Sequence, residues 1–345
     1  MSMTKETTVT GGGGAIRTDE PSPPARQEAR RLLVNAERFG LLVIFVVILV
    51  VFSVVSSGFF TLNNFRIVLG SEAVLGILAL ASIVPLICGE FDLSVGANMG
   101  ASAIVLGTCM SRFHVGLGPA IVITLVFGLL VGLANGLLVA KVGVNSFIVT
   151  LAMSTFLAGL VQWYTNGTSI STGISQFLVR TATGDLLGIP KGLFWLLPVG
   201  LVAWYVLGHT PYGRALTSIG SNRKAAQLVG LRVSRLTLSS FLISGVLAAL
   251  AGVLTVGQSG DANPQLVEGT LLLAALAAAF LGRSAFRPGR FNVPGTILAV
   301  YFVAFSVSGL EFLGAASWVA QVFDGLALAG AVTVTTVLAR KNAPQ

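Results

Sequence analysis

The sequence predicts an all-α polytopic membrane protein of about ten transmembrane helices, some broken or re-entrant, with both termini in the cytoplasm. Three observations predict this class. Only 10% of the 345 residues are charged, whereas a soluble protein carries about 25%. Long apolar runs follow one another along the chain, and the mean hydropathy is +0.88. The Lys and Arg residues gather in alternate connections between those runs.

The apolar runs set the number of spans. A spanning helix needs about 20 mostly apolar residues. Helices are expected because backbone groups in lipid must be paired within the segment or in a closed barrel, and the runs are too long and unbroken for barrel strands. The expected spans lie near residues 41–60, 70–89, 93–111, 117–140, 146–164, 193–208, 236–257, 266–282, 292–310 and 317–338.

The basic residues set the orientation. With ten spans, 17 of the 21 Lys and Arg residues fall on the side of the two termini, and such connections face the cytoplasm. An error of one span would scatter them over both faces. The net charge of +8 therefore reflects membrane orientation and not a nucleic-acid partner, because the basic residues form no patch interleaved with aromatic residues.

The ends of the chain differ from its middle. Residues 1–38 hold Gly11–Gly14, three prolines and a charged run, without the apolar core of a secretory signal. We expect a disordered cytoplasmic tail that ends in a short amphipathic helix. Residues 39–339 form the transmembrane domain, with a cytoplasmic loop at 210–235, and residues 340–345 form a short cytoplasmic tail.

No motif indicates catalysis. A phosphate-binding loop of the GxxxxGK[ST] type is excluded, because no Gly-Lys dipeptide occurs. The two histidines are far apart, no metal-ligand cluster or GxSxG motif is present, and Cys88 and Cys109 lie in apolar runs, as small apolar residues do. We expect no enzyme activity, no metal and no cofactor.

A polar segment interrupts the second and third apolar runs. Glu90 and Asp92 follow Pro85, and each carboxylate would cost about 2.5 kcal/mol or more at the centre of a lipid-exposed helix. They must face protein, water or the membrane surface. Asp92 precedes a helical run and is placed to cap it. A break that lines a solute path and a capped surface turn are equally good interpretations.

Other polar residues lie in or beside the spans. Their side chains can offer hydrogen bonds to a polyol, and Asn263 would lie with Asp261 and Gln265 at an outer mouth. Asp324 needs a partner, a water-filled cavity or a proton, and a role in transport and a structural role are nearly equal alternatives for it. The candidates for the solute path are Asp92, Ser94, Asn98, Asn135, Ser146, Thr150, Tyr164, Asn166 and Asn263.

Glycines recur at helical spacing, at Gly96 and Gly100 and again at Gly128, Gly132 and Gly136. Small residues at this spacing let helix backbones approach closely in lipid. They indicate either a dimer interface or packing within one bundle, and we favour packing within the bundle.

The longest polar connection runs from residue 210 to residue 235. Asn222 can cap a short helix at 223–229, and Gly230 can end it. A folded cytoplasmic helix between two spans indicates a docking partner, whereas the plainer alternative is a solvated connector.

Several motifs together resemble one family. Asp92-Leu93-Ser94-Val95-Gly96 is the most specific of them, and three more support it: the run 135–141 with 147–151, Tyr164-Thr165-Asn166-Gly167, and Gly213-Arg214 with Ile219-Gly220-Ser221-Asn222, Ala225-Ala226 and Gly230. The chain resembles the permease subunits of ribose-type ATP-binding-cassette (ABC) importers, from Phe59 to Leu338.

The resemblance implies a non-catalytic, multi-pass subunit in the bacterial inner membrane that imports a sugar or related polyol. It implies a second permease subunit, as a homodimer or a pseudo-symmetric heterodimer, with cytoplasmic ATPase subunits that bind the ATP and a periplasmic solute-binding protein. It also implies that the 210–235 loop transmits ATPase movement, with Gly213, Arg214, Asn222, Ala226 and Gly230 as coupling residues.

The chain departs from the family pattern at several polar positions. Glu90-Phe91 replaces the usual Gly-Ile, acidic residues are usual where Leu272 and Ala274 stand, and Lys is common at Asp324. The turn at 283–287 also lacks the usual glycines. An ion-coupled secondary transporter, using membrane carboxylates, is the alternative function. A non-transporting scaffold is the third.

Overall fold

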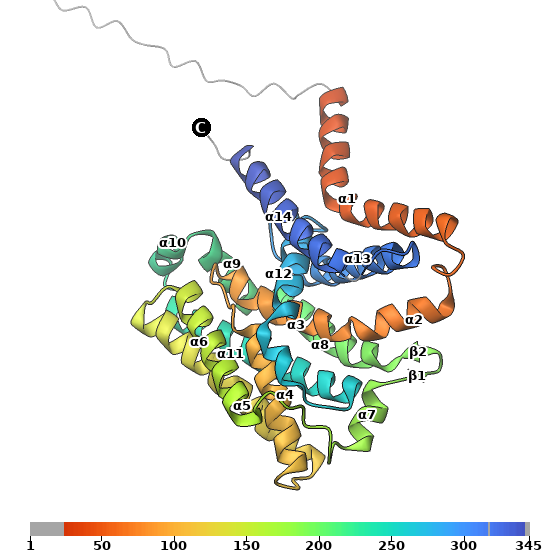
Figure 1. Cartoon of the computed structure of the whole chain (residues 1–345). Coiled ribbons are helices and arrows are strands. Elements are labelled where there is room, and N and C mark those ends of the chain that lie inside the picture. Colours follow the sequence, from red (N-terminus) through yellow and green to blue (C-terminus); the bar gives the residue numbers. More distant parts are fainter. Residues whose placement is uncertain (1–23, 317, 342–345) are drawn as a thin grey trace, which may run out of the picture. The chain divides into compact units, whose positions relative to one another are not determined.

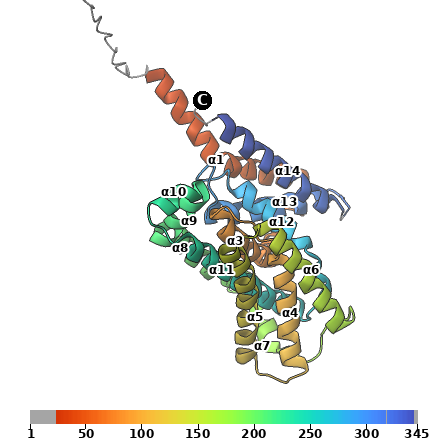
Figure 2. The ribbon, with the colours of Figure 1, turned by 90° about the vertical axis from the view of Figure 1, so that its left-hand side faces the viewer.

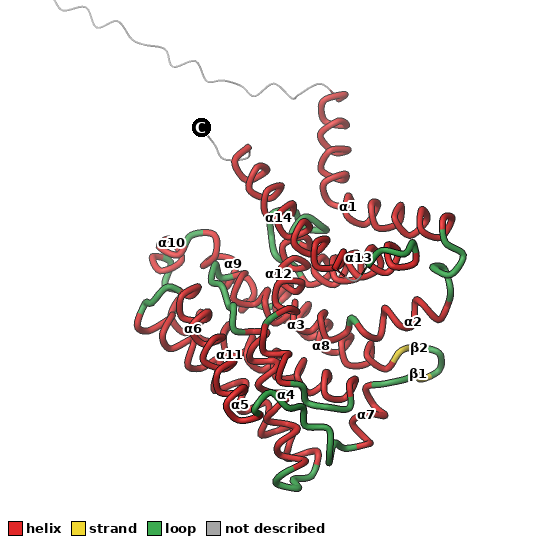
Figure 3. The backbone as a smooth tube through the Cα atoms, in the orientation of Figure 1, coloured by secondary structure: helices red, strands yellow, loops and turns green. Residues whose placement is uncertain are grey.

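The structure is a computed structural model that describes residues 24–316 and 318–341, and it is almost entirely helical (Figure 3). The chain divides into two units, Met1–Ala36 and Glu37–Gln345. Residues 1–23 and 342–345 lie outside the described part, so the expected disorder of the first tail stays a prediction. The packing contacts and cavities lie in the second unit.

Fourteen helices, α1 to α14, occur in the described part of the chain, with one small hairpin, β1–β2, in which Asp185 pairs with Pro190 (Figure 1). A π-helical turn extends α5, and a 3₁₀ turn precedes α12. The bounds are α1 Pro24–Val55, α2 Leu62–Ser71, α3 Ala73–Ile87, α4 Val95–Ser111, α5 Leu117–Leu137, π turn Leu138–Val142, α6 Ser146–Thr165, α7 Gln176–Ala182, β1 Asp185–Leu186, β2 Ile189–Pro190, α8 Lys191–His209, α9 Pro211–Ser221, α10 Arg223–Leu228, α11 Val233–Ser259, 3₁₀ turn Pro264–Glu268, α12 Thr270–Gly282, α13 Val293–Phe312 and α14 Trp318–Lys341.

Each of the ten predicted spans coincides with a helix, but the helices differ in reach. Among the described residues, seven helical segments are long and apolar enough to cross a membrane. Helix α4 has 17 residues and α12 only 13, and a 13-residue helix is about 20 Å long, less than the hydrocarbon thickness. The 266–282 run is therefore a 3₁₀ turn followed by a short helix, which fits the re-entrant alternative better than a full span.

Helix α11 is the centre of the packing, and it contacts α5, α3 and α4 (Figure 2). Its crossing with α5 depends on glycine. A methyl group added at Gly132 would meet the carbonyl oxygen of Phe241, and one at Gly128 would meet that of Gly245. Gly96 and Gly100 on α4 are also closely packed, since a methyl group at Gly100 would meet Val267 and one at Gly96 would meet Leu272. These glycines pack within the bundle, as we favoured over a dimer interface.

The surface confirms the expectation from composition. Large apolar side chains are more than half exposed along several helices, among them Val50 on α1, Ile148 on α6 and Leu201 on α8. Exposed apolar surface on this scale marks contact with lipid or with other proteins. Around α3, by contrast, residues such as Ile77 and Leu78 are fully buried.

Candidate functional site

The α3–α4 break is created by the local sequence. Pro85 has no N–H to donate, and its carbonyl oxygen accepts from the N–H of both Cys88 and Glu90. Gly89 follows with φ +83°, a left-handed conformation that glycine adopts without steric cost. The chain can therefore leave α3, run extended for a few residues and start α4 at Val95.

Asp92 is the centre of the break and is 4% exposed. Its Oδ1 accepts from the Ser94 N–H at 3.0 Å and from the Ser94 Oγ at 2.6 Å, while its Oδ2 accepts from the Ser244 Oγ on α11 at 2.8 Å. The predicted cap of α4 by Asp92 is wrong: the N-cap residue is Ser94, whose side chain does not cap the first turn, and Asp92 bonds Ser94 itself, because the helix starts three residues after Asp92. A buried carboxylate needs such donors, because an unpaired one would be very costly.

Two further helices are attached to the same break. The Asn135 Nδ2 on α5 donates to the Ser94 Oγ at 2.8 Å. On α6, the Ser146 Oγ accepts from the Phe91 N–H at 3.1 Å and the Thr150 Oγ1 accepts from the Leu93 N–H at 3.0 Å. We name this set the polar knot: Asp92, Ser94, Asn135, Ser146, Thr150 and Ser244.

Asn98 lies one turn further along α4. Its Nδ2 donates to the Gly245 carbonyl at 3.2 Å, which ties α4 to the glycine crossing of α5 and α11. Six of the nine solute-path candidates therefore lie close together, all buried. Ser244 joins them and was missed, because a serine in an apolar helix gives no sequence signal of its partner. The Asn135 Oδ1 is buried without a hydrogen-bond partner among the described residues.

The remaining three candidates lie elsewhere. Tyr164 stacks against Arg112, with the guanidinium carbon 4.7 Å from the ring centroid. Asn166 ends α6 in the left-handed conformation at φ +49° and is exposed. The Asn263 side chain caps the 3₁₀ turn by accepting from the Gln265 N–H at 2.9 Å. The role of all nine in solute contact stays a prediction, and the side chain of Asp324 lies outside the described residues.

A separate cavity is lined in part by polar side chains, of which Ser71 and Glu311 are exposed. It has a volume of about 610 Å³ and lies between α2, α12 and α13. Ser71, Glu72, Ser308 and Glu311 line it, together with Asn64, and Glu311 is exposed. We name it the acidic cavity. Ala274, where the resemblance led us to expect an acid, also lines it, so its carboxylates come from other elements, a placement that the sequence did not indicate.

A larger cavity of about 730 Å³ lies between α1, α8 and α13 but is lined almost entirely by apolar side chains. Its tyrosine, Tyr301, donates its hydroxyl to the Leu69 carbonyl at 3.2 Å. This cavity has little to offer a polar solute.

The 210–235 connection is folded into two short helices: α10 is the helix predicted at 223–229, and α9, at Pro211–Ser221, was not predicted. The Asn222 Oδ1 accepts from the Ala225 N–H at 3.0 Å at the start of α10, and Gly230 follows its end at φ +83°. Ala226 is buried, Arg214 is exposed, and a methyl group at Gly213 would meet the Leu207 carbonyl. Among the coupling residues, Gly213, Asn222, Ala226 and Gly230 therefore shape the segment, while Arg214 faces outward.

This architecture is that of a multi-pass α-helical membrane protein with a broken helix at its polar centre, a feature of transport proteins. The chain belongs to the family described as branched-chain amino acid transport system / permease component, whose model matches residues 64–332. It is a non-catalytic ABC transporter permease subunit and a multi-pass protein of the inner membrane, which decides against the ion-coupled and scaffold alternatives.

Similar proteins agree with the family. The chain is 30% identical over 296 residues to the ribose import permease protein RbsC of Escherichia coli K12, covering 85% of this chain and 92% of that protein. It is 31% identical to RbsC of Bacillus subtilis 168, with 83% and 88% covered. It is 28% identical to the autoinducer 2 import system permease protein LsrC of Photorhabdus laumondii, with 86% and 89% covered. No solved structure matches the chain.

Proposed function

We propose that this chain is the permease subunit of an importer that moves a monosaccharide or a related polyol across the bacterial inner membrane. Separate ATPase subunits bind and hydrolyse the ATP, so the chain itself needs no cofactor. A periplasmic binding protein delivers the solute, and a second permease subunit completes the pathway as a homodimer. The ribose permeases among its relatives support the sugar class.

One observation carries the ATPase partnership: α9–α10 has a buried face and an exposed apolar tip. Leu216 and Ile219 are buried against the end of α3, whereas Leu228 is 88% exposed and Val229 is 77% exposed. Apolar side chains at the tip of a polar connection are a favourable contact for another protein. We propose that this tip docks on the ATPase.

The acidic cavity supports a polyhydroxyl solute. Carboxylate and hydroxyl oxygens accept hydrogen bonds from sugar hydroxyls, and Glu311 and Ser71 offer such oxygens at exposed positions next to apolar surface from α2, α12 and α13. Most ligand pockets combine an apolar wall with a few polar groups in this way.

The orientation is also part of the proposal. Ten membrane-inserted helices with both termini in the cytoplasm would place α9–α10 and its basic residues on the ATPase side. The acidic cavity lies beside α2 and the C-terminal half of α13, away from α9–α10. In this orientation it would open toward the periplasm. In this arrangement the solute meets the cavity before it reaches the polar knot.

The test is uptake of radiolabelled ribose, xylose and galactose by proteoliposomes that contain the permease, its co-encoded ATPase and the binding protein. We expect ATP-dependent uptake of one of these sugars. The variant Leu228→Asp should lose ATPase association in a pull-down, whereas Leu187→Asp, which changes another exposed leucine, should retain it. Uptake that persists without ATP and collapses with the proton gradient would contradict the proposal.

A further inference from the structure

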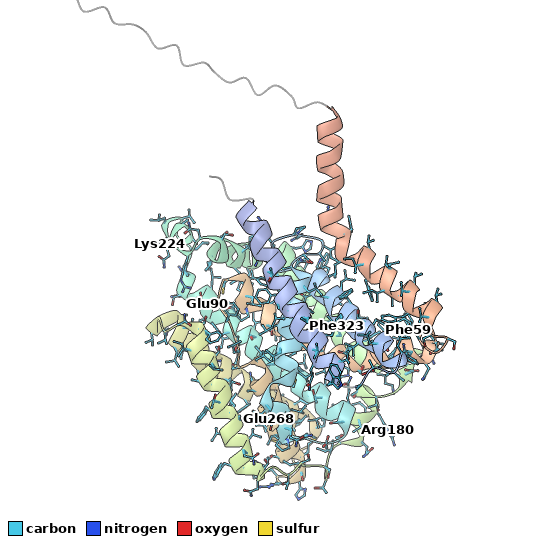
Figure 4. The ribbon with its side chains drawn as sticks, turned by 45° about the horizontal axis from the view of Figure 1, so that its top comes forward. Phe59, Glu90, Arg180, Lys224, Glu268 and Phe323 are labelled. Atoms are coloured by element: carbon cyan, nitrogen blue, oxygen red, sulfur yellow. The ribbon has the colours of Figure 1, made fainter. Side chains whose placement is uncertain are left out.

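Glu90 and Arg223 form an ion pair that joins the α3–α4 break to the first residue of α10. The two residues are 133 positions apart in the sequence. The Glu90 side chain is only 14% exposed and that of Arg223 is 42% exposed. Figure 4 shows Glu90 close to the segment that carries Lys224, the neighbour of Arg223.

The rest of the boundary between the break and α9–α10 has few polar connections. Gly220 lies against the Ile87 carbonyl, where a methyl group would not fit. Beside this contact, Gly89 and Phe91 line a cavity of about 340 Å³ together with Thr217 and Ser221. Within the described part of the chain, the ion pair is the one hydrogen-bonded connection between the break and α9–α10.

The break on the other side of Glu90 is held firmly. Phe91 and Leu93 are bonded to α6, and Asp92 is bonded to α11. The ion pair therefore adds a charged route from α10 to the break and to α6. It acts beside the apolar packing of Leu216 and Ile219 on α3 and the direct connection of α10 to α11 through residues 229–232. Glu90 is largely removed from water, and within the described residues Arg223 is the cation that pairs with its charge.

We infer that the Glu90–Arg223 ion pair transmits movement of the α9–α10 segment to the polar knot, and that both residues are positioning residues for transport. The inference rests on the proposed function. It assigns a use to Glu90, a position where the chain departs from the family pattern. Electrostatic attraction allows the segment and the break to move together without a rigid backbone link.

Cys88 provides a readout that needs neither ATPase nor solute. It is 2% exposed, precedes the break, and its Sγ lies 3.4 Å from the Ser240 Oγ. In a Cys109→Ser background it is the chain's one thiol. Loss of the ion pair should loosen the break, so Glu90→Gln and Arg223→Gln should each raise the rate of Cys88 labelling by a membrane-permeant maleimide at least threefold.

Transport provides the second readout. In the complete complex, each single variant should lower sugar uptake at least fivefold while ATP hydrolysis stays within twofold of the wild type. The charge swap Glu90→Arg with Arg223→Glu should restore at least half of the lost uptake and the slow labelling. Arg287→Gln, which removes an exposed charge that forms no ion pair within the described residues, should behave as the wild type.

A cross-link keeps the inference testable if the swapped protein does not fold. Cysteines at 90 and 223, in a background with Cys88 and Cys109 changed to serine, should react with a short bis-methanethiosulfonate, which joins the two thiols through reducible disulfides and releases methanesulfinate. Because the two cysteines remove the ion pair, uptake should be low before cross-linking, should rise when the linker joins the two positions, and should fall again on reduction. Wild-type labelling and uptake in both single variants, or uptake that stays low after cross-linking, would overturn the inference. Failure of the wild type itself to transport would contradict only the proposed function.

Discussion

The polar knot and the acidic cavity both place carboxylates inside an apolar protein, but in opposite ways. In the knot, Asp92 receives three hydrogen bonds and is almost fully buried. In the cavity, Glu311 is exposed and lines an open space. A buried and fully bonded carboxylate holds helices in place, whereas an open one is available to a solute. A polar residue in a span is thus not by itself evidence of a transport path.

The largest expected effect breaks the knot. Asp92→Ala leaves the Ser94 and Ser244 donors unpaired in a buried site, and we expect each unpaired donor to cost about 1–3 kcal/mol of folding free energy. Little monodisperse protein should survive size-exclusion chromatography in detergent. Asp92→Asn keeps the shape and one acceptor, so it should retain more folded protein. Equal yields of wild type and Asp92→Ala would show that the knot is not structural.

A smaller effect is expected at the edge of the knot. Thr150→Val keeps the side-chain shape but leaves the Leu93 N–H without its acceptor, which should cost about 1–3 kcal/mol. Thermal unfolding in detergent measures this as a lower Tm. Thr155→Val is the matched control, because that threonine is exposed on the same helix and bonds only the Leu151 carbonyl. A larger drop for the control would contradict the importance of the break.

The acidic cavity should respond in transport and not in stability. Glu311→Gln removes a charge that faces open space, and we expect uptake to fall about tenfold, equivalent to about 1.4 kcal/mol, with an unchanged Tm. Glu268→Gln alters another exposed carboxylate away from the cavity and should leave uptake unchanged. If Glu311→Gln lowers the Tm instead, Glu311 has a structural role like that of Asp92. The contrast between the cavity and the knot would then be wrong.

The smallest effect is expected at Tyr164. Its ring stacks on Arg112, and Tyr164→Phe keeps that ring while removing only the hydroxyl. Stability should change by no more than about 0.5 kcal/mol, and uptake should stay at the wild-type level. A clear fall in uptake at normal stability would restore Tyr164 as a solute contact, so the same uptake assay decides the question.

The positions of the helices could be predicted well because span length follows from lipid thickness and apolar content. The predicted run at 236–257 lies wholly within α11. The run at 41–60 lies within α1 up to Val55, where that helix ends. The start of the helix in the run at 266–282 was harder to predict. The first residues of this run are part of a 3₁₀ turn that begins at Pro264 and is followed by Gly269. Local turn chemistry there shortened the helix.

The candidate site was predicted in part. Asp92, Ser94 and Asn135 could be found because polar residues in apolar runs are conspicuous, and the short helix after Asn222 was predicted from its cap. Their partners could not be found. Ser244 and Arg223 lie more than 130 residues from Asp92 and Glu90, and hydropathy patterns carry no information about which helices meet.

The sequence by itself determined that this chain is a membrane protein, at which residues its helices lie, and to which family it belongs. These properties depend on composition, on the length of apolar runs and on short motifs. Only the tertiary structure decided that Asp92 is enclosed in a polar knot, that Glu90 meets Arg223 and that Glu72 and Glu311 share a cavity. The physical reason is that hydrogen bonds and ion pairs act over a few ångströms, and only packing determines which distant residues come that close.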